Sequence, residues 1–485
     1  MLAIDAGTTG VTCLRFDADL RVEARAYREF SQGFPVPGHV EHRAEDILAA
    51  VDATLSEALK GHVGPIAAVG ITNQRETVFA VDVVRDEVLG PGLVWQDRRT
   101  APRCAELKAD GHEAEVRRIT GLTLDPYFSG TKIEWLLRER SDVRAAADRG
   151  HVRFLTVDAL IVRHLTGGAT VATDFTNASR TLLFDLESRS WSKDMADLLG
   201  VPLSTLPEVR GSSDDYGTAR LPGGRSAPIR GVLGDQQAAL FGQGCWTPGT
   251  FKNTYGTGCF LLLNTGSERR DVPGLLTTLA ADASGAPCYA VEGSVFAGGV
   301  VIQWLRDQLG ILEAAEDSEA LARTVPDSGG VTLVPAFVGL GAPYWDPDAR
   351  AALLGLTRGT SRAHIARAAL EAIALQCTEL VTLLREGTGL AIDTLQVDGG
   401  AARNDLLMQM QADFAGLTIV RPSEVESTAR GAAAMAAVGI ELRSDLGSAA
   451  GFQAGTTRFE PTLAAEEQAE RLADWRTAVG RILTR

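Results

Sequence analysis

Hydrophobic and polar positions along this chain follow the periods of helices and strands in turn. Amphipathic helices are predicted at 44–59, 132–140, 157–166, 300–309, 362–384, 404–414, 429–438 and 463–483. Short apolar runs predict strands at 66–71, 231–233, 331–335 and 394–397. The proline- and glycine-rich segment 221–230 is predicted as a loop, and a helix is expected to begin near Asp235. Elements that alternate in this way predict an α/β fold with mixed sheets.

Two strand pairs joined by glycine- and threonine-rich turns are predicted far apart in the chain. The first pair, 2–4 and 11–16, flanks Gly7-Thr8-Thr9-Gly10. The second pair, 253–255 and 259–263, flanks Gly256-Thr257-Gly258. Similar hairpins at such a distance indicate two halves of related topology. With the boundary placed between 242 and 250, the predicted domains are 1–243 and 244–485.

Composition narrows the classes of function. The 485 residues exceed one ordinary domain, and 45% hydrophobic and 22% charged residues are typical of globular proteins. No apolar run reaches the roughly 20 residues that span a bilayer, and no secretory signal is present, so we expect a cytoplasmic protein without membrane insertion. A net charge of −15 argues against nucleic acid as a partner. The cysteines and histidines lack the spacing of disulfide frameworks or metal cages.

Several glycine-rich turns could give so acidic a chain the local positive potential that an anionic ligand needs. In the segment 5–10, Asp5 stands at a strand end before turn amides and hydroxyls, which suits a magnesium-bound phosphate. The turn 256–258 offers a second set of amides. The segments 297–299 and 397–404 each lead into a helix, whose N-terminus favours negative charge. Each segment is also compatible with an ordinary turn, with Asn404 as a helix N-cap, and none is a Walker loop.

Polar residues follow two of the predicted strands. Asp235, after the strand 231–233, could accept the proton of a substrate hydroxyl or could cap the helix that begins there. The polar segment 72–77 follows the strand 66–71 and would be costly inside an apolar core. Within it, Arg75 can donate hydrogen bonds to hydroxyl groups and Glu76 can accept them.

Three aromatic residues could border a site for a small hydroxylated molecule. Trp95 offers a flat apolar wall for a carbon chain, and a position in the core is also compatible with its surroundings. Tyr127 lies on a predicted loop and offers a hydroxyl group. Phe260 follows the second glycine-threonine turn, so it could close the site from the second domain.

Over essentially its whole length, the chain resembles the glycerol kinases of the FGGY carbohydrate kinase family. The stretches that carry the resemblance are 71–77, 125–132, 174–181, 234–242, 253–260, 339–346 and 397–401. The resemblance implies a two-domain α/β fold of the actin/hexokinase-like (ribonuclease H-like) ATPase class, hinged around a central cleft. It also implies a homo-oligomer, either a dimer or a tetramer.

The resemblance further implies transfer of the γ-phosphate of ATP, with Mg²⁺, to a terminal hydroxyl of glycerol, which gives sn-glycerol 3-phosphate. The first domain would bind the polyol and the second would bind ATP. Asp235 would be the general base and Asp5 the Mg²⁺-associated carboxylate. The implied glycerol contacts are Arg75, Glu76, Trp95, Tyr127, Asp235, Gln236 and Phe260. The implied nucleotide contacts are Thr8, Thr9, Thr257, Gly299, Gln303, Gly400 and Asn404.

The first glycine-threonine turn departs from the family pattern. The usual loop reads Asp-Gln-Gly-Thr-Thr-Ser-Ser-Arg, whereas here Ala6 replaces the glutamine and Thr12 the arginine. A lost cation near the phosphate could cost about 1–3 kcal/mol of transition-state stabilisation, unless Arg15 or another cation compensates. Two alternatives stay open: a kinase of another polyol or ketose, and, supported by Ala6 and Thr12 alone, a weakly catalytic nucleotide-binding regulator.

Overall fold

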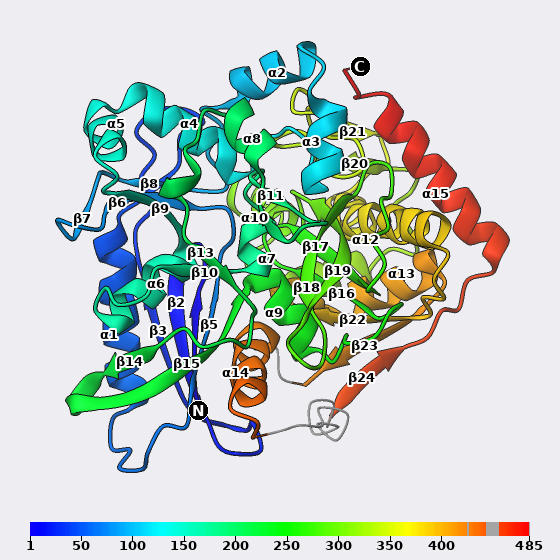
Figure 1. The fold of residues 1–485 in the computed structure, drawn as a ribbon. Helices are drawn as coiled ribbons and strands as arrows, with labels where there is room; N and C mark the ends of the chain where they lie inside the picture. The colour runs from blue at the N-terminus through cyan, green and yellow to red at the C-terminus, as the bar shows by residue number, and fades with distance from the viewer. Residues whose placement is uncertain (424–425, 443–454, 485) are drawn as a thin grey trace. The chain divides into compact units, whose positions relative to one another are not determined.

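The chain folds into two compact units, each assembled from separate stretches. The computed structural model describes residues 1–423, 426–442 and 455–484 (Figure 1). The first unit contains 1–246, 277–289 and the described residues from 427 onward to 442. The second unit contains 247–276, the described part of 290–426, and 455–484. The chain first changes unit between Trp246 and Thr247, within the predicted boundary region, and two later stretches return to the first unit.

The first unit is built on a six-stranded sheet in the order β14-β15-β5-β1-β2-β3. Its strands are β1 (Leu2–Ala6), β2 (Gly10–Phe16), β3 (Val22–Glu29), β5 (Val69–Asn73), β14 (Thr218–Leu221) and β15 (Arg225–Gly234). A smaller sheet contains β4 (Glu41–His42), β6 (Val78–Asp82), β7 (Glu87–Val88), β8 (Gly92–Leu93) and β9 (Val152–Thr156). β1 pairs antiparallel with β2 and parallel with β5. The β1–β2 turn and the C-terminal end of β5 therefore lie next to each other, at the same end of these central strands.

Helices cover both faces of the larger sheet. Its alternate positions Leu2, Ile4 and Ile71 pack in one apolar core with α1 and α6, while α14 covers the opposite face. The helices of this unit are α1 (Ala44–Ala58), α2 (Ala101–Ala109), α3 (Glu113–Thr120), α4 (Ser129–Glu139), α5 (Ser141–Asp148), α6 (Val157–Thr166), α7 (Phe175–Ala178), α8 (Lys193–Leu198), α9 (Asp235–Gly242) and α14 (Ser427–Gly439).

Small residues explain why α14 packs with the first unit although it comes late in the chain. A Cβ on Gly70 of β5 would lie 2.2 Å from the Ala432 carbonyl oxygen, and one on Gly431 would lie 1.9 Å from the Ala238 carbonyl oxygen. The backbones of α14, α9 and the sheet therefore touch directly, as Figure 1 shows for α14 (orange) beside β15. This packing fixes α9, which begins with Asp235.

The prediction of a loop at 221–230 is wrong from residue 225 onward, because β15 begins at Arg225. β14 and β15 form an antiparallel hairpin in which Thr218 pairs with Pro228. Pro228 lies in the part of β15 that pairs with β14 alone, because pairing with β5 begins at Ile229, and a proline is tolerated where one side of a strand is unpaired. The predicted strand 66–71 is also displaced, since β5 runs from Val69 to Asn73.

The second unit repeats the arrangement of the first hairpin. β16 pairs antiparallel with β17 and parallel with β22, as β1 does with β2 and β5, which confirms the predicted halves of related topology. The strands in this part of the chain are β16 (Phe251–Tyr255), β17 (Cys259–Gly266), β18 (Leu276–Ala281), β19 (Pro287–Val295), β20 (Thr332–Val334), β21 (Ala352–Leu354), β22 (Thr394–Asp398), β23 (Thr418–Pro422) and β24 (Thr456–Phe459).

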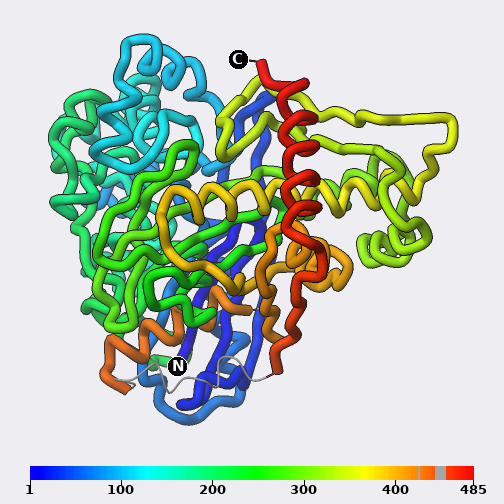
Figure 2. Tube along the Cα trace, turned by 90° about the vertical axis from the view of Figure 1, so that its right-hand side faces the viewer, coloured from blue at the N-terminus to red at the C-terminus, as the bar shows by residue number. Residues whose placement is uncertain are grey.

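The long helix α12 (Arg362–Thr388) is central to the second unit. It contacts the other helices, which are α10 (Val300–Asp307), α11 (Asp317–Ala322), α13 (Asp405–Ala415) and α15 (Ala465–Gly480). Figure 2 shows α15 in red running across α12 in yellow. The predicted helices 300–309, 362–384, 404–414 and 463–483 are confirmed with shifted ends.

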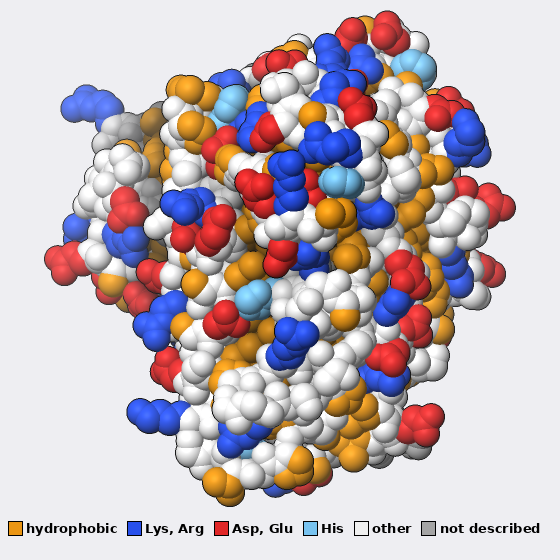
Figure 3. All heavy atoms as spheres, turned by 60° about the vertical axis from the view of Figure 1, so that its left-hand side comes forward, with side chains coloured by type: hydrophobic (Ala, Val, Ile, Leu, Met, Phe, Trp, Pro, Cys, Tyr) orange, Lys and Arg blue, Asp and Glu red, His pale blue; other side chains and the backbone are white. Residues whose placement is uncertain are grey.

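The surface and the helices bear on possible partners. On the face in Figure 3, acidic and basic side chains are intermixed, so this face presents no continuous basic patch of the kind that binds nucleic acid. Within the described residues, no helix has both the length and the apolar character required to cross a membrane.

Candidate active site

Four charged side chains of alternating sign form a row in the first unit. Arg180 Nε lies 2.7 Å from Glu76 Oε1, and Arg75 Nε lies 3.8 Å from the same oxygen. Arg75 Nε also lies 3.2 Å from Asp235 Oδ1. The side chains of Arg75, Glu76 and Arg180 are at most 2% exposed, whereas that of Asp235 is 28% exposed. Of the four side chains, that of Asp235 is the most exposed, and it lies at one end of the row.

Asp235 is the first residue of α9 and does not cap it. Gly234 is the N-cap residue, and its backbone N–H donates to Thr176 Oγ1 at 2.8 Å. The Asp235 carboxylate accepts from the neighbouring Gln236 N–H at 2.7 Å. The capping explanation of Asp235 is therefore wrong by one position. The carboxylate lies at the positive end of the helix, where a negative charge is stabilised.

Trp95 and Tyr127 border the same region of the first unit. Their ring centroids are 5.6 Å apart at an interplanar angle of 70°. Trp95 is half-buried, so it is not a closed core residue, and its indole N–H donates to Thr8 Oγ1 at 3.0 Å. Tyr127 is buried, and its hydroxyl oxygen lies 3.5 Å from Arg75 Nη2. An edge-to-face pair of this kind gives a rigid apolar wall with polar atoms at its rim.

Lys132 holds the loop that carries Tyr127. Its ammonium group is fully buried and donates to the backbone carbonyls of Pro126 at 2.5 Å and Tyr127 at 2.9 Å. Burial lowers the pKa of Lys132 to about 8, while the carboxylates of Asp97, Glu76 and Asp125 favour its charged form. Because hydrogen bonds from a charged donor are strong, the bonds from the buried Lys132 ammonium to these carbonyls hold the Tyr127 loop more firmly than hydrogen bonds to water would.

The first glycine-threonine turn lies at the end of β1 and carries Thr8 and Thr9, with Asp5 on the strand before it. Gly7 N–H closes the turn on the Gly10 carbonyl at 3.0 Å, and Gln74 Nε2 donates to the Gly7 carbonyl at 3.0 Å. His42 Nδ1 lies 3.3 Å from Gln74 Nε2, and burial lowers the pKa of His42 to about 4. Neutral, buried side chains therefore support this turn from beneath.

Arg15 does not replace the arginine that position 12 lacks. It lies at the other end of β2, pairs with Glu23 at 3.1 Å and donates to the Ala58 carbonyl at 2.8 Å. It lies five positions along the strand from Gly10, a distance of about 17 Å. The suggestion that Arg15 compensates for Thr12 is therefore wrong.

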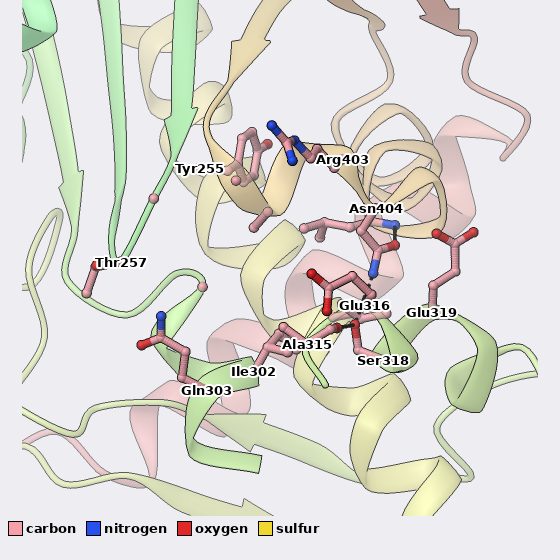
Figure 4. A pocket seen from close by; sticks show the side chains of 16 residues that line it. Tyr255, Thr257, Ile302, Gln303, Ala315, Glu316, Ser318, Glu319, Arg403 and Asn404 are labelled. Atoms are coloured by element: carbon pink, nitrogen blue, oxygen red, sulfur yellow. Dashed lines mark hydrogen bonds between the residues drawn. The ribbon is translucent and has the colours of Figure 1, made fainter. Parts of the chain in front are cut away.

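A cavity of about 540 Å³ opens in the second unit (Figure 4). Figure 4 shows Thr257 and Gln303 on one side and Asn404 with Glu319 on the other. The β16–β17 turn, the start of α10 and the segment before α13 contribute its walls. Five residues predicted to contact nucleotide line it together: Thr257, Gly299, Gln303, Gly400 and Asn404.

The backbone of this cavity leaves room for a ligand at one point in particular. A Cβ on Gly400 would meet no atom within 4 Å, whereas a Cβ on Gly299 would lie 2.8 Å from the Gly256 carbonyl oxygen. Asn404 caps α13 by accepting from Leu407 N–H at 2.9 Å, which confirms the N-cap prediction, and its Nδ2 donates to Ser318 Oγ at 3.3 Å. Open space beside exposed amides and a helix N-terminus fits a phosphorylated ligand.

The donor set also fits a magnesium ion carried by a nucleotide. Among the described residues, no three His, Cys, Asp or Glu side chains gather closely enough to hold a metal ion. Magnesium is usually held by one or two carboxylates together with phosphate oxygens and water. Asp5, half-buried at the strand end before the first turn, is a carboxylate of this kind.

The remaining predicted residues are divided between the units. Gln236 is buried on α9 in the first unit, beside Asp235. Phe260 is half-buried at the start of β17 in the second unit. Thr8 and Thr9 belong to the first unit, unlike the other predicted nucleotide contacts. The structure thus brings together six of the polyol contacts in the first unit and five of the nucleotide contacts in the second, whereas Phe260, Thr8 and Thr9 belong to the other unit from the rest of their sets.

Sequence reasoning assigned no role to three residues at this site. Arg180 and Lys132 lie in stretches that carry the family resemblance, and Gln237 follows Gln236. Gln237 Oε1 accepts from Arg75 Nη1 at 3.2 Å. The signal that could have indicated them is the presence of long cationic or amide side chains within otherwise apolar or small-residue stretches.

Comparison with known proteins agrees with these features. Residues 1–242 match the N-terminal domain, and residues 251–440 the C-terminal domain, of the FGGY family of carbohydrate kinases. The chain is 49% identical to a glycerol kinase of Shewanella piezotolerans, with 99% of each chain covered, and 50% identical to one of Aromatoleum aromaticum, covering 99% and 98%. It is also similar to the crystal structure of Plasmodium falciparum glycerol kinase with ADP, with a TM-score of 0.92 at 31% identity over 100% and 98% of the two chains.

Proposed function

The chain belongs to the FGGY family of carbohydrate kinases, and on that premise we propose that it phosphorylates glycerol with ATP. Relatives named glycerol kinase that are about half identical over the full length support this substrate. The observation that carries the proposal is the row from Arg180 to Asp235. Its most exposed carboxylate, that of Asp235, pairs with Arg75, which also lies 3.5 Å from the Tyr127 hydroxyl of the aromatic wall.

On the polyol side, the proposed roles follow from the chemistry of the groups. Arg75 donates to hydroxyl oxygens, Glu76 accepts from hydroxyl groups, and Trp95 and Tyr127 pack against the carbon chain. Gln236 and Phe260 complete the contacts. Asp235 accepts the proton of one terminal glycerol hydroxyl. The oxygen of that hydroxyl attacks the γ-phosphorus of ATP, and the bond between the γ-phosphorus and the oxygen that leaves with ADP breaks.

On the nucleotide side, the cavity of the second unit is proposed to hold ATP. Its contacts are Thr257, Gly299, Gln303, Gly400 and Asn404. Thr8 and Thr9 would donate to the terminal phosphates from the first unit, and Asp5 would hold Mg²⁺ directly or through water. The magnesium ion neutralises charge on the phosphates during transfer.

We further propose that the predicted domains 1–243 and 244–485 divide these tasks, the first binding polyol and the second binding ATP. The stretches 277–289 and 427–442 would then support the polyol side, because they pack in the first unit. Cytoplasmic localisation, where MgATP is available, and a homo-oligomeric state, dimer or tetramer, belong to the same proposal.

A substrate panel tests the proposed function. Purified protein is mixed with MgATP and either glycerol, a ketopentose or a longer polyol, and ADP release is followed with a coupled enzyme assay. We expect glycerol to give the highest kcat/KM and sn-glycerol 3-phosphate as the product. A ketose turned over far better than glycerol would contradict the proposed substrate, and ATP binding without glycerol-dependent ADP release would favour a regulator.

A further inference from the structure

Among the described residues of the first unit, Arg180 is the largest charged side chain buried without any exposure, and no role has been assigned to it. It follows the short helix α7, whose start Asp174 caps by accepting from the Thr176 and Asn177 N–H groups. The side chain reaches across 104 positions of sequence to Glu76, where Nε donates to Oε1 at 2.7 Å. An ion of this size is buried only where specific partners compensate for its lost hydration.

Two aromatic rings form the rest of its surroundings. The Arg180 Cζ atom lies 5.5 Å from the ring centroid of Tyr127 and 5.2 Å from that of Phe128. A planar guanidinium against aromatic rings is a cation–π contact, and a lysine ammonium reproduces its shape poorly. One side chain therefore contacts both Glu76 and Tyr127, two of the proposed polyol contacts.

Glu76 needs such support because its backbone is strained. Its φ of 65° lies in the left-handed region, which non-glycine residues seldom adopt. The Glu76 carbonyl accepts from Ser129 Oγ at 2.8 Å, which fixes the backbone from α4. Strained residues of this kind occur at sites where the surrounding contacts hold a functional group in place. Arg180 supplies the corresponding contact for the carboxylate.

We propose that Arg180 is a positioning residue that sets the specificity of the polyol site for a triol, an inference that rests on the proposed function. It holds the Glu76 carboxylate and the Tyr127 ring against the hydroxyl groups that are not phosphorylated. Arg75, in contrast, contacts Asp235 as well as Glu76. Loss of Arg180 should therefore weaken recognition of the spectator hydroxyls more than it affects the base.

The test compares glycerol with two diols that each lack one hydroxyl, propane-1,2-diol and propane-1,3-diol. The measured quantity is kcat/KM for glycerol divided by kcat/KM for the better of the two diols. For Arg180→Met, we expect this ratio to fall about tenfold or more, because a displaced Glu76 no longer forms a hydrogen bond with the extra hydroxyl of glycerol. Most of the loss should appear in the KM for glycerol, and ADP binding should be unchanged. Arg180→Lys, which keeps the charge and loses the planar contact, should give an intermediate ratio.

Two further variants separate positioning from general destabilisation. Arg140→Met removes a half-buried arginine that pairs with Asp142 at the surface and should leave the ratio unchanged. Combining Arg180→Met with Glu76→Gln should cost little more than Glu76→Gln alone, because both act through the same carboxylate. Fully additive losses would contradict the proposal.

The outcomes distinguish this inference from the proposed function. A wild-type protein that does not phosphorylate glycerol overturns both. An active wild type whose glycerol-to-diol ratio is unchanged in folded Arg180→Met overturns the positioning role alone. Should Arg180→Met fail to fold, Arg180→Lys decides: an intermediate ratio supports the role, and a wild-type ratio contradicts it.

Discussion

The polyol side in the first unit and the nucleotide cavity in the second handle charge in opposite ways. Around Asp235, Arg75, Glu76 and Arg180 are almost wholly removed from solvent, and opposite charges alternate within the protein. Around the cavity, the predicted contacts are glycines and uncharged side chains, with Arg403 and two glutamates on the wall. The polyol side is thus an ionic network of two cations and two carboxylates, whereas the predicted nucleotide contacts in the cavity carry no charge.

This difference follows from what each site is proposed to bind. A polyol is uncharged, so it cannot compensate a buried carboxylate, and the protein must supply every counter-charge itself. A nucleotide brings its own charge and its own metal ion, so amides and a helix N-terminus suffice to receive it. We therefore expect substitutions of charged side chains to have the largest effects on activity on the polyol side, and substitutions of glycines to matter most on the nucleotide side.

The largest effect is expected from Asp235→Asn, which removes the accessible carboxylate while keeping its size. We expect kcat to fall by about 10²–10⁴-fold, because proton acceptance from the hydroxyl is lost. ADP affinity, measured by calorimetry, should be unchanged. Asp142→Asn, a change at an exposed carboxylate paired with Arg140, is the control. Near wild-type turnover in Asp235→Asn would show that Asp235 is not the general base.

The second prediction concerns His42, the neutral buried side chain that supports the first glycine-threonine turn. The folded protein lowers the pKa of His42 from 6.5 to about 4, so its contribution to stability is complete above pH 6.5 and is lost as pH falls toward 4. Between pH 7 and pH 5, wild type should lose about 2 kcal/mol more unfolding free energy than His42→Gln. Urea denaturation of both proteins at the two pH values measures the difference.

A comparison with the variant is needed because a second buried group titrates in the opposite direction. Burial raises the pKa of Asp158 from 3.8 to about 6, so its contribution is complete below pH 3.8 and is lost as pH rises through 6. The pH profile of wild type alone therefore contains both effects. Equal losses in wild type and His42→Gln would show that His42 is not held neutral.

The third prediction tests the hydrogen bond from Trp95 to the first glycine-threonine turn separately from the packing of its aromatic ring. Trp95→Phe keeps a ring and removes the hydrogen bond to Thr8. We expect kcat/KM for ATP to fall about 2–10-fold, the value of one ordinary hydrogen bond. Trp191→Phe loses an indole bond to the Pro207 carbonyl instead and should leave catalysis unchanged. If the two variants behave alike, the link to Thr8 has no role in nucleotide binding.

The smallest effect is expected on the nucleotide side. Gly400→Ala adds a methyl group where the protein itself leaves open space, so folding should be unaffected while a bound nucleotide is crowded. We expect the KM for ATP to rise about threefold and the KM for glycerol to stay constant, since a ligand in an open cavity can shift and so loses less than the roughly 1–3 kcal/mol of overpacking a protein core. Gly480→Ala, also in open space but on α15, is the control. An unchanged KM for ATP would place the nucleotide elsewhere.

The elements that sequence patterns predicted well are those whose cause is local. Both glycine-threonine hairpins and the helix α6 at 157–166 occur where predicted, because turn residues and apolar period act over a few positions. The prediction of a loop at 221–230 failed because Pro228 signals a break, although this proline lies before the point where β15 begins to pair with β5.

The parts of the site that sequence reasoning missed depend on contacts between distant residues. Arg180 meets Glu76 across 104 positions, and α14 reaches the first unit through glycines whose meaning appears only when two backbones touch. Asp235 illustrates the limit differently. A helix cap and a first-turn carboxylate differ by one position, which exceeds the precision of a predicted helix end.

The central claim is that Asp235 receives the hydroxyl that Glu76 and Arg75 help to orient. A crystal structure of the Asp235→Asn variant with glycerol and a magnesium-bound ATP analogue tests it directly. We expect one terminal hydroxyl within about 3 Å of the residue 235 side chain and a second hydroxyl within hydrogen-bonding distance of Glu76. Glycerol bound away from these side chains, or with no terminal hydroxyl near residue 235, would contradict the account.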